Sequence, residues 1–229
     1  MRFSLIIPSY NNAQELGKEL PELIDYLRKH HLDAEVLVVH DGSGQRELLE
    51  KICAEHGWTL LHHDVNIGKG AAVKTGMLAA TNDIRIFTDA DIPFQYDIFL
   101  EIIHAFDDST VKVVCGDRRK SDYFSKTPPV RRLGSGIFST IVNIIMLRNL
   151  GDTQCGIKGF RAEAVQHIFP NSYIKGFAAD IEWLYLAKKS GITVRWVNAE
   201  FRNAGESSVV FWKQALRMLG DVIRLRFRL

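Results

Sequence analysis

The feature that most constrains the fold is an alternation of short apolar runs with longer segments of helical spacing. The apolar runs cover residues 3–7, 35–39, 59–62, 83–87 and 112–115, and helical spacing covers residues 13–30, 47–55, 69–80 and 98–106. Strands that are apolar on both faces are typical of a parallel sheet buried between helices. The alternation therefore predicts an α/β fold with a mostly parallel central sheet covered by helices on both faces.

The second half of the chain has a different pattern. A polar segment with two prolines, residues 121–129, predicts a loop. Helices are expected at residues 133–150, 177–190 and 208–226, and a strand at residues 193–197. We expect one domain over residues 1–205, made of the halves 1–117 and 118–205, followed by a basic amphipathic helix at 206–229.

Composition excludes several classes of protein. With 29 basic and 27 acidic side chains, the net charge of +2 is too small to predict a nucleic-acid-binding protein. Three widely spaced cysteines, Cys53, Cys115 and Cys155, argue against a disulfide framework or a zinc site. No window approaches ~18 uninterrupted apolar residues, and the N-terminal apolar run is too short for a signal peptide. We therefore expect a cytoplasmic protein, or one attached to the cytoplasmic face of a membrane.

One acidic motif directly follows an expected strand. Asp89 and Asp91, separated by Ala90, come after the apolar run 84–87. In open α/β sheets, ligands bind beyond the carboxyl ends of the strands, where these carboxylates would lie. Mg²⁺ in proteins takes one or two carboxylates and completes its coordination with water and substrate phosphates. The motif therefore predicts a divalent cation and a substrate that carries a diphosphate.

Further motifs stand around this one in a characteristic order. The first half reads Pro8-Ser9-Tyr10-Asn11, Val39-His40-Asp41-Gly42-Ser43, Asn66-Ile67-Gly68-Lys69-Gly70 and Thr88-Asp89-Ala90-Asp91. Together they resemble the family 2 inverting glycosyltransferases, whose fold is the nucleotide-sugar-binding GT-A type. The later stretches Asp152-Thr153-Gln154-Cys155-Gly156-Ile157-Lys158-Gly159-Phe160 and Phe177-Ala178-Ala179-Asp180-Ile181-Glu182 are similar to the dolichyl- or polyprenyl-phosphate sugar synthases. The resemblance spans residues 3–205.

The resemblance implies a set of donor-binding residues in the half 1–117, together with one from the other half. They are Pro8, Tyr10, Asp41, Lys69, Asp89, Ala90, Asp91 and Arg202, with Asp89 and Asp91 holding Mg²⁺ or Mn²⁺. The chain departs from the family pattern at Asn12, His40 and Pro93, where many members carry other residues. These departures leave the nucleotide, UDP or GDP, and the third metal ligand open.

The half 118–205 is expected to bind the acceptor. A sugar hydroxyl would need a general base, whereas a phosphate monoester is already ionised and needs cations to position it. The chain offers Arg118, Arg119, Arg131 and Arg132 for an acceptor phosphate, although such a cluster is also compatible with a solvated face. Asp152 and Asp180 are the candidate catalytic carboxylates, with Glu182 less favoured, and each could instead cap a turn or a helix.

The helix expected at residues 208–226 carries apolar side chains on one face and basic side chains on another. A basic amphipathic helix that contains a tryptophan, here Trp212, is typical of helices at a membrane interface. The apolar segment 133–150 could lie on the bilayer too, although a buried core helix is the commoner explanation. We expect peripheral attachment to the membrane.

Three functions remain open at this point. The first is transfer of a hexose, glucose or mannose, from a UDP- or GDP-sugar to a polyprenyl or dolichyl phosphate. The second keeps the fold but transfers the sugar to a saccharide hydroxyl. The third is a non-catalytic, membrane-recruited binding protein with a degenerate transferase fold. The sequence leaves the oligomeric state open.

Overall fold

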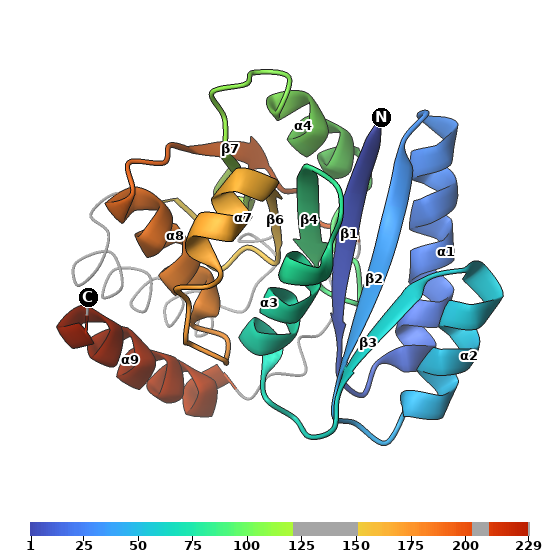
Figure 1. The fold of residues 1–229 in the computed structure, drawn as a ribbon, viewed down its shortest axis with the longest axis horizontal. Helices are drawn as coiled ribbons and strands as arrows, with labels where there is room; N and C mark the ends of the chain where they lie inside the picture. Colours follow the sequence, from blue (N-terminus) through green and yellow to red (C-terminus); the bar gives the residue numbers. More distant parts are fainter. Residues whose placement is uncertain (121–150, 203–210, 229) are drawn as a thin grey trace.

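The computed structural model describes residues 1–120, 151–202 and 211–228. In these residues seven strands form one sheet in the order β3-β2-β1-β4-β6-β5-β7 (Figure 1). The strands are β1 (Arg2–Ser9), β2 (Asp33–Asp41), β3 (Thr59–His63), β4 (Ile84–Thr88), β5 (Val113–Asp117), β6 (Ile157–Arg161) and β7 (Val194–Asn198). The helices are α1 (Ala13–Lys29), α2 (Arg46–His56), α3 (Lys69–Ala79), α4 (Asp97–Ala105), α7 (Ala162–Ile168), α8 (Ala179–Lys189) and α9 (Phe211–Arg228), with a short 3-10 turn over Arg118–Lys120.

The sheet is mostly parallel, as the sequence predicts. Strand β1 pairs in parallel with β2 and β4, β2 with β3, and β5 with β7. Strand β6 runs antiparallel to both of its neighbours, β4 and β5. The sequence patterns missed β6 and the short helix α7 that follows it, because Lys158 and Gly159 interrupt the apolar run. Strand β6 lies within the stretch 152–160 that carries the resemblance to the lipid-phosphate sugar synthases.

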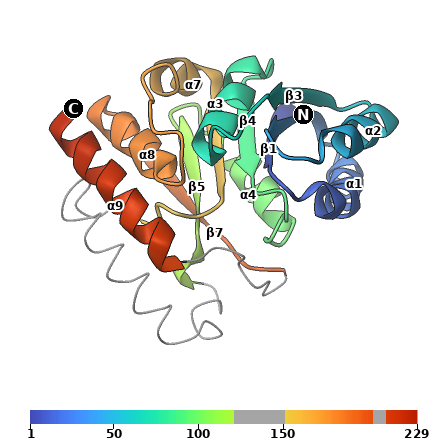
Figure 2. The same ribbon diagram turned by 90° about the horizontal axis from the view of Figure 1, so that it is seen from below.

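Helices cover both faces of the sheet because the strands bury side chains on both sides. Leu5 and Ile7 of β1 belong to a core that includes residues of α1, α2 and α4. Ile6, between them, belongs to a second core formed with residues of α3, α7, α8 and α9. Figure 2 shows these two sets of helices on opposite sides of the strands. The three-layer arrangement confirms the predicted fold class.

The C-terminal helix α9 packs on the body of the protein. Val222 and Leu225 are buried in the second core, beside α8. Phe227 and Ile223 point the other way, with exposed fractions of 88% and 41%. None of the helices in the described residues is long and apolar enough to cross a membrane. The predicted loop 121–129 and helix 133–150 lie outside the described residues.

Candidate active site

The predicted donor motifs converge at one edge of the sheet. Strands β1, β2 and β4 are parallel to one another and end at this edge. Strand β5 ends there too, because it is antiparallel to β6, which is itself antiparallel to β4. Strand β6 begins at the same edge, where Ile157 pairs with Thr88. The next positions outward are Gly156 and Asp89, so the register alone brings the acidic motif against the 152–160 stretch.

Asp89 is held between a lysine and a glycine. The Lys69 ammonium lies 2.5 Å from the Oδ1 atom of Asp89. On the other side, a Cβ atom added to Gly156 would lie 2.1 Å from Asp89 Oδ2, so the carboxylate occupies the space that a side chain at position 156 would need. This glycine therefore forms one wall of the site.

Asp91 lies two residues on, in a tight turn. The amide of Ile92 donates to the carbonyl of Asp89 (3.0 Å), and Ile92 has a φ of 38°, a left-handed conformation that β-branched residues rarely adopt. Asp91 keeps contact with solvent, but the surrounding protein removes part of its hydration, and this loss together with the nearby charge of Asp89 raises its pKa to about 6. Two carboxylates that repel each other in this way favour a bound cation.

The pair Asp89 and Asp91 fits a divalent cation that shares its coordination with a substrate. In the described residues no group of three or more His, Cys, Asp or Glu side chains is arranged to hold a metal. Mg²⁺ commonly binds through two carboxylates and completes its shell with phosphate oxygens and water. The hard oxygen donors of these two residues match that type of site.

The loop that presents Lys69 is organised by Asp41. The carboxylate of Asp41 is buried at the end of β2 and accepts hydrogen bonds from the amides of Ile67 (3.0 Å) and Gly68 (2.8 Å). It also bonds the His63 ring at 2.8 Å, and that ring reaches Thr75 of α3 at 2.9 Å. These contacts fix the start of α3, and with it Lys69, relative to the sheet edge. The predicted role of Asp41 at the base or ribose stays a prediction.

Two helices begin beside this cluster. Helix α3 starts at Lys69, and the amide of Ala71 donates to the carbonyl of Lys175 (3.1 Å), just before α8 begins. A Cβ atom added to Gly70 would lie 2.4 Å from the Cβ atom of Ala179, the first residue of α8, so the two helix starts touch. Helix N-termini carry partial positive charge and free amide groups, which favour a nearby anion.

The burial of Lys69 is offset by its acidic neighbours. Loss of hydration alone would lower the pKa of this lysine, but the charges of Asp89, Asp180 and Asp91 outweigh it and raise the pKa. The side chain therefore stays a cation at neutral pH, beside the acidic motif and the two helix starts.

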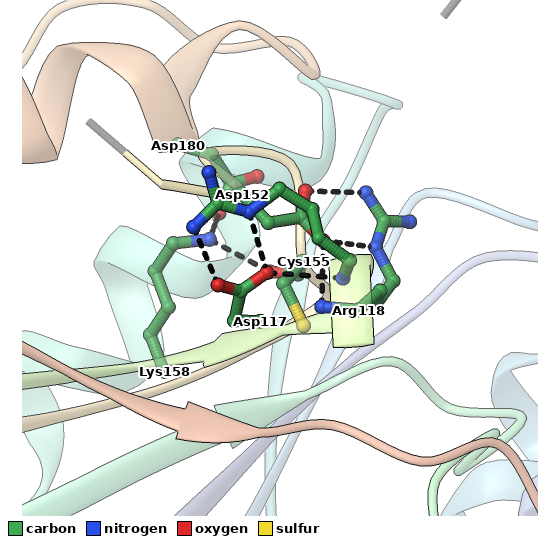
Figure 3. A network of polar contacts seen from close by, with 7 residues as sticks. Asp117, Arg118, Asp152, Cys155, Lys158 and Asp180 are labelled. Carbon is green, nitrogen blue, oxygen red and sulfur yellow. Dashed lines mark hydrogen bonds and ion pairs between the residues drawn. The ribbon is translucent and has the colours of Figure 1, made fainter. Parts of the chain in front are cut away.

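Two of the four predicted acceptor arginines, Arg118 and Arg119, pair with acids at the end of β5 (Figure 3). Arg118 binds Asp152 through both carboxylate oxygens, at 2.5 and 2.7 Å, and its amide donates to the same group at 3.1 Å. Arg119 binds the buried Asp117 in the same two-pronged way, at 2.8 and 2.6 Å. Asp152 was expected to be a catalytic carboxylate, and both of its oxygens accept hydrogen bonds from Arg118.

Asp180, the second candidate carboxylate, lies in a buried ion pair. The ammonium of Lys158 is fully buried, lies 2.5 Å from Asp180 and donates to the carbonyl of Cys155 (2.7 Å). Figure 3 shows the Lys158 side chain extending from β6 toward Asp180. Since Cys155 precedes Gly156, the pair ties the start of α8 to the wall against which Asp89 lies. The structure therefore links Asp180 to the acidic motif of Asp89 and Asp91 through Lys158.

Other predicted residues lie at varied distances from this cluster. Pro8 is buried and Tyr10 is half exposed, at and just beyond the end of β1, and Ala90 is packed in the first core. The guanidinium of Arg202 contacts the Tyr96 ring and pairs with Glu19 and Glu22 of α1, so its predicted role at the donor phosphates stays a prediction. Arg131 and Arg132 lie outside the described residues.

Sequence reasoning assigned no role to Gly156, Asp117, His63 or Lys158. Gly156 stands within a quoted motif, but only the pairing of β4 with β6 shows that a side chain at position 156 would collide with Asp89. Glu182, a less favoured candidate, is fully buried and accepts hydrogen bonds from Ser172 and the amides of residues 173 and 174, so it anchors a loop.

Comparison with known proteins shows the family to which the chain belongs. The sequence profile of glycosyl transferase family 2 matches residues 4–169. Dolichyl-phosphate beta-glucosyltransferase of Dictyostelium discoideum is 29% identical over 243 residues, which cover 98% of this chain and 74% of that protein. The human protein of the same name is 27% identical over 252 residues, which cover 99% of this chain and 75% of its own length.

Solved structures show the same fold. Mannosyl-3-phosphoglycerate synthase from Rubrobacter xylanophilus has a TM-score of 0.74 at 17% identity, over 100% of this chain and 73% of that chain. Glucosyl-3-phosphoglycerate synthase from Mycobacterium tuberculosis, solved with Mn²⁺, UDP-glucose and phosphoglyceric acid, has a TM-score of 0.69 at 16% identity, over 96% and 79% of the two chains. These likenesses confirm the predicted GT-A fold. The chain belongs to glycosyl transferase family 2 and is a glycosyltransferase.

Proposed function

We propose that this chain transfers glucose from a nucleotide diphosphate sugar to a dolichyl or polyprenyl phosphate, with inversion at the anomeric carbon. The observation that carries the proposal is the placement of Asp89 between Lys69 and Gly156, with Asp91 beside it. The curated relatives support glucose as the sugar and a lipid phosphate as the acceptor, because they are dolichyl-phosphate beta-glucosyltransferases.

The donor's diphosphate would lie between the acidic motif and the two helix starts. Asp89 and Asp91 would hold Mg²⁺ or Mn²⁺, and this metal acts as a Lewis acid that neutralises charge developing on the nucleoside diphosphate. Lys69 and the first amides of α3 and α8 supply further positive charge in the same place. The M. tuberculosis relative of the same fold was solved with Mn²⁺ and UDP-glucose, which supports this pairing of metal and donor.

The acceptor side favours a nucleophile that arrives already ionised. A phosphate oxygen of the lipid would bond to the anomeric carbon as the bond from that carbon to the donor's phosphate oxygen breaks, and the nucleoside diphosphate leaves with the electron pair. A saccharide hydroxyl would instead need a base, yet Asp152 and Asp180 are each engaged in an ion pair. Asp117 and Asp152 would position Arg119 and Arg118 at the end of β5 for the lipid phosphate.

Helix α9 would attach the enzyme to the membrane that holds its acceptor. The stripe formed by Val222 and Leu225 faces the protein, so the membrane-facing side would be the exposed pair Ile223 and Phe227 with the arginines around it. Aromatic and aliphatic side chains flanked by arginine are typical of helices that lie in the interface of a bilayer.

A donor and acceptor screen tests the proposal. Full-length protein is incubated with Mn²⁺ and radiolabelled UDP-glucose or GDP-mannose, with dolichyl phosphate, undecaprenyl phosphate or a soluble saccharide as acceptor. We expect label in the organic phase with UDP-glucose and a lipid phosphate. Label confined to the saccharide would instead establish the hydroxyl acceptor, and turnover of neither donor would contradict the proposed reaction.

A further inference from the structure

Lys69 occupies the approach to Asp89 that a divalent cation would use. The two oxygens of this carboxylate have different surroundings: Oδ2 faces the Cα atom of Gly156, and Oδ1 lies 2.5 Å from the Lys69 ammonium. Gly156 restricts one side of Oδ2, and a cation that approaches Asp89 through Oδ1 must share that oxygen with the ammonium or displace the ammonium. The ammonium and a divalent cation repel each other at such a distance.

A Lys69 ammonium displaced from Asp89 would need another anionic partner. Asp180 also lies near this lysine, but Asp180 is the close ion-pair partner of the buried Lys158, which is further fixed by the carbonyl of Cys155. Asp91 would be engaged by the same metal as Asp89. A new anion becomes available with the diphosphate of the donor, which would arrive at the start of α3, where Lys69 stands.

The charge balance of the cluster leads to the same result. With Glu15, whose charge also acts on Asp91, four carboxylates face two ammonium groups, Lys69 and Lys158, which gives a net charge of −2. A divalent cation alone would neutralise this charge but would leave the Lys69 ammonium and the cation in mutual repulsion at Asp89. A diphosphate that enters with the metal brings the cluster back to negative charge and offers Lys69 a new partner.

We propose that Lys69 makes the binding of the divalent cation conditional on the nucleotide diphosphate. In the absence of nucleotide the Lys69 ammonium is paired with Asp89, and a bound diphosphate accepts this ammonium and frees the Asp89 carboxylate for the cation. Metal and nucleotide then bind synergistically, and by linkage each raises the affinity for the other by the same factor. The inference rests on the proposed function for the diphosphate but not on the sugar or on the acceptor.

Mn²⁺ binding measured without any transfer tests this role. Free Mn²⁺ is followed by electron paramagnetic resonance during titration of the full-length protein, alone and with UDP or GDP. For the wild-type protein we expect an Mn²⁺ affinity at least about tenfold higher with one of the nucleotides. For Lys69→Gln we expect an about tenfold higher affinity in the absence of nucleotide, and a gain from nucleotide of less than about threefold.

Two further variants separate charge from general disturbance. Lys69→Arg keeps the positive charge and should bind Mn²⁺ weakly without nucleotide, like the wild type. Lys51→Gln removes one exposed charge on α2 and should also behave like the wild type. Circular dichroism establishes that each variant is folded.

The outcomes distinguish this inference from the proposed reaction. Lys69→Gln binding Mn²⁺ no more tightly than the wild type, in the absence of nucleotide, would overturn the role of Lys69. An Asp89→Asn variant with wild-type Mn²⁺ binding would overturn it too, because the metal would lie elsewhere. If the synergy is found but no sugar reaches a lipid phosphate, the inference stands and the proposed acceptor is wrong.

Discussion

The contact between Gly156 and Asp89 allows a severe test with one added methyl group. In Gly156→Ala the new Cβ atom would lie 2.1 Å from Asp89 Oδ2, whereas real Cβ atoms essentially never approach another heavy atom closer than 3.0 Å. The carboxylate must therefore retreat by about 0.9 Å or more. Position 156 has no left-handed φ, so alanine meets no backbone strain there, and the disturbance is confined to the contact with Asp89.

The displacement is large compared with the tolerance of a catalytic site. A misplacement of about 1 Å can cost ~10²-fold in rate. We therefore expect Gly156→Ala to lose about 10²-fold in glucose transfer to lipid phosphate and to bind Mn²⁺ more weakly in the presence of nucleotide. The rate is measured as organic-phase radioactivity at saturating donor, and Mn²⁺ binding by electron paramagnetic resonance.

Gly176→Ala is the matched control. A Cβ atom at position 176 meets nothing within 4 Å, and this glycine also lacks a left-handed φ, although it lies close to the start of α8. Its transfer rate should stay within about twofold of the wild type. A Gly156→Ala enzyme that is as active as this control would refute the assignment of Asp89 to the reaction centre.

Two predictions concern stability. Lys158→Met should lower the free energy of unfolding by about 3–5 kcal/mol in urea titrations, because it removes the close ion-pair partner of the buried Asp180; a loss below 1 kcal/mol would contradict the buried pair. At Glu35, burial acts to raise the pKa, but hydrogen bonds from Ser4, Thr81 and Asn82 prevail and lower it. That stabilisation is present above the unfolded pKa of about 4.3 and is lost as the pH falls through the lower native pKa. Glu35→Gln should therefore cost about 1–2 kcal/mol at pH 7 and distinctly less at pH 3, and an equal cost at both would contradict the charged network.

The sequence predicted the architecture well where strands are apolar on both faces. β1, β2 and β4 follow that rule, and their carboxyl ends carry the motifs that meet at the sheet edge. The prediction from sequence failed at β6, because this strand contains the buried Lys158, whose charge is paired with Asp180. A pattern of apolar residues cannot reveal a strand whose polar side chain is satisfied by a partner 22 residues away.

The site was predicted in part for a similar reason. Asp89 and Lys69 stand in recognisable motifs, and both lie in the cluster. The partners of the acceptor-side residues depend on tertiary pairing, so sequence reasoning named Arg118 and Asp152 for separate roles, whereas the structure joins them in one ion pair. The amphipathic pattern of α9 was also ambiguous, because Val222 and Leu225 face the protein while Phe227 faces outward.

The most direct test of the account is the transfer activity of Asp89→Asn. This change keeps the shape of the side chain and removes the charge that would hold both the metal and Lys69. With Mn²⁺, UDP-glucose and dolichyl phosphate, we expect organic-phase counts to fall by about 10³-fold or more while urea unfolding shows a folded protein. Asp25→Asn, at an exposed position of α1, controls for the loss of one negative charge and should leave the counts unchanged. Counts within about threefold of the wild type for Asp89→Asn would contradict the central claim that this carboxylate holds the donor end of the site.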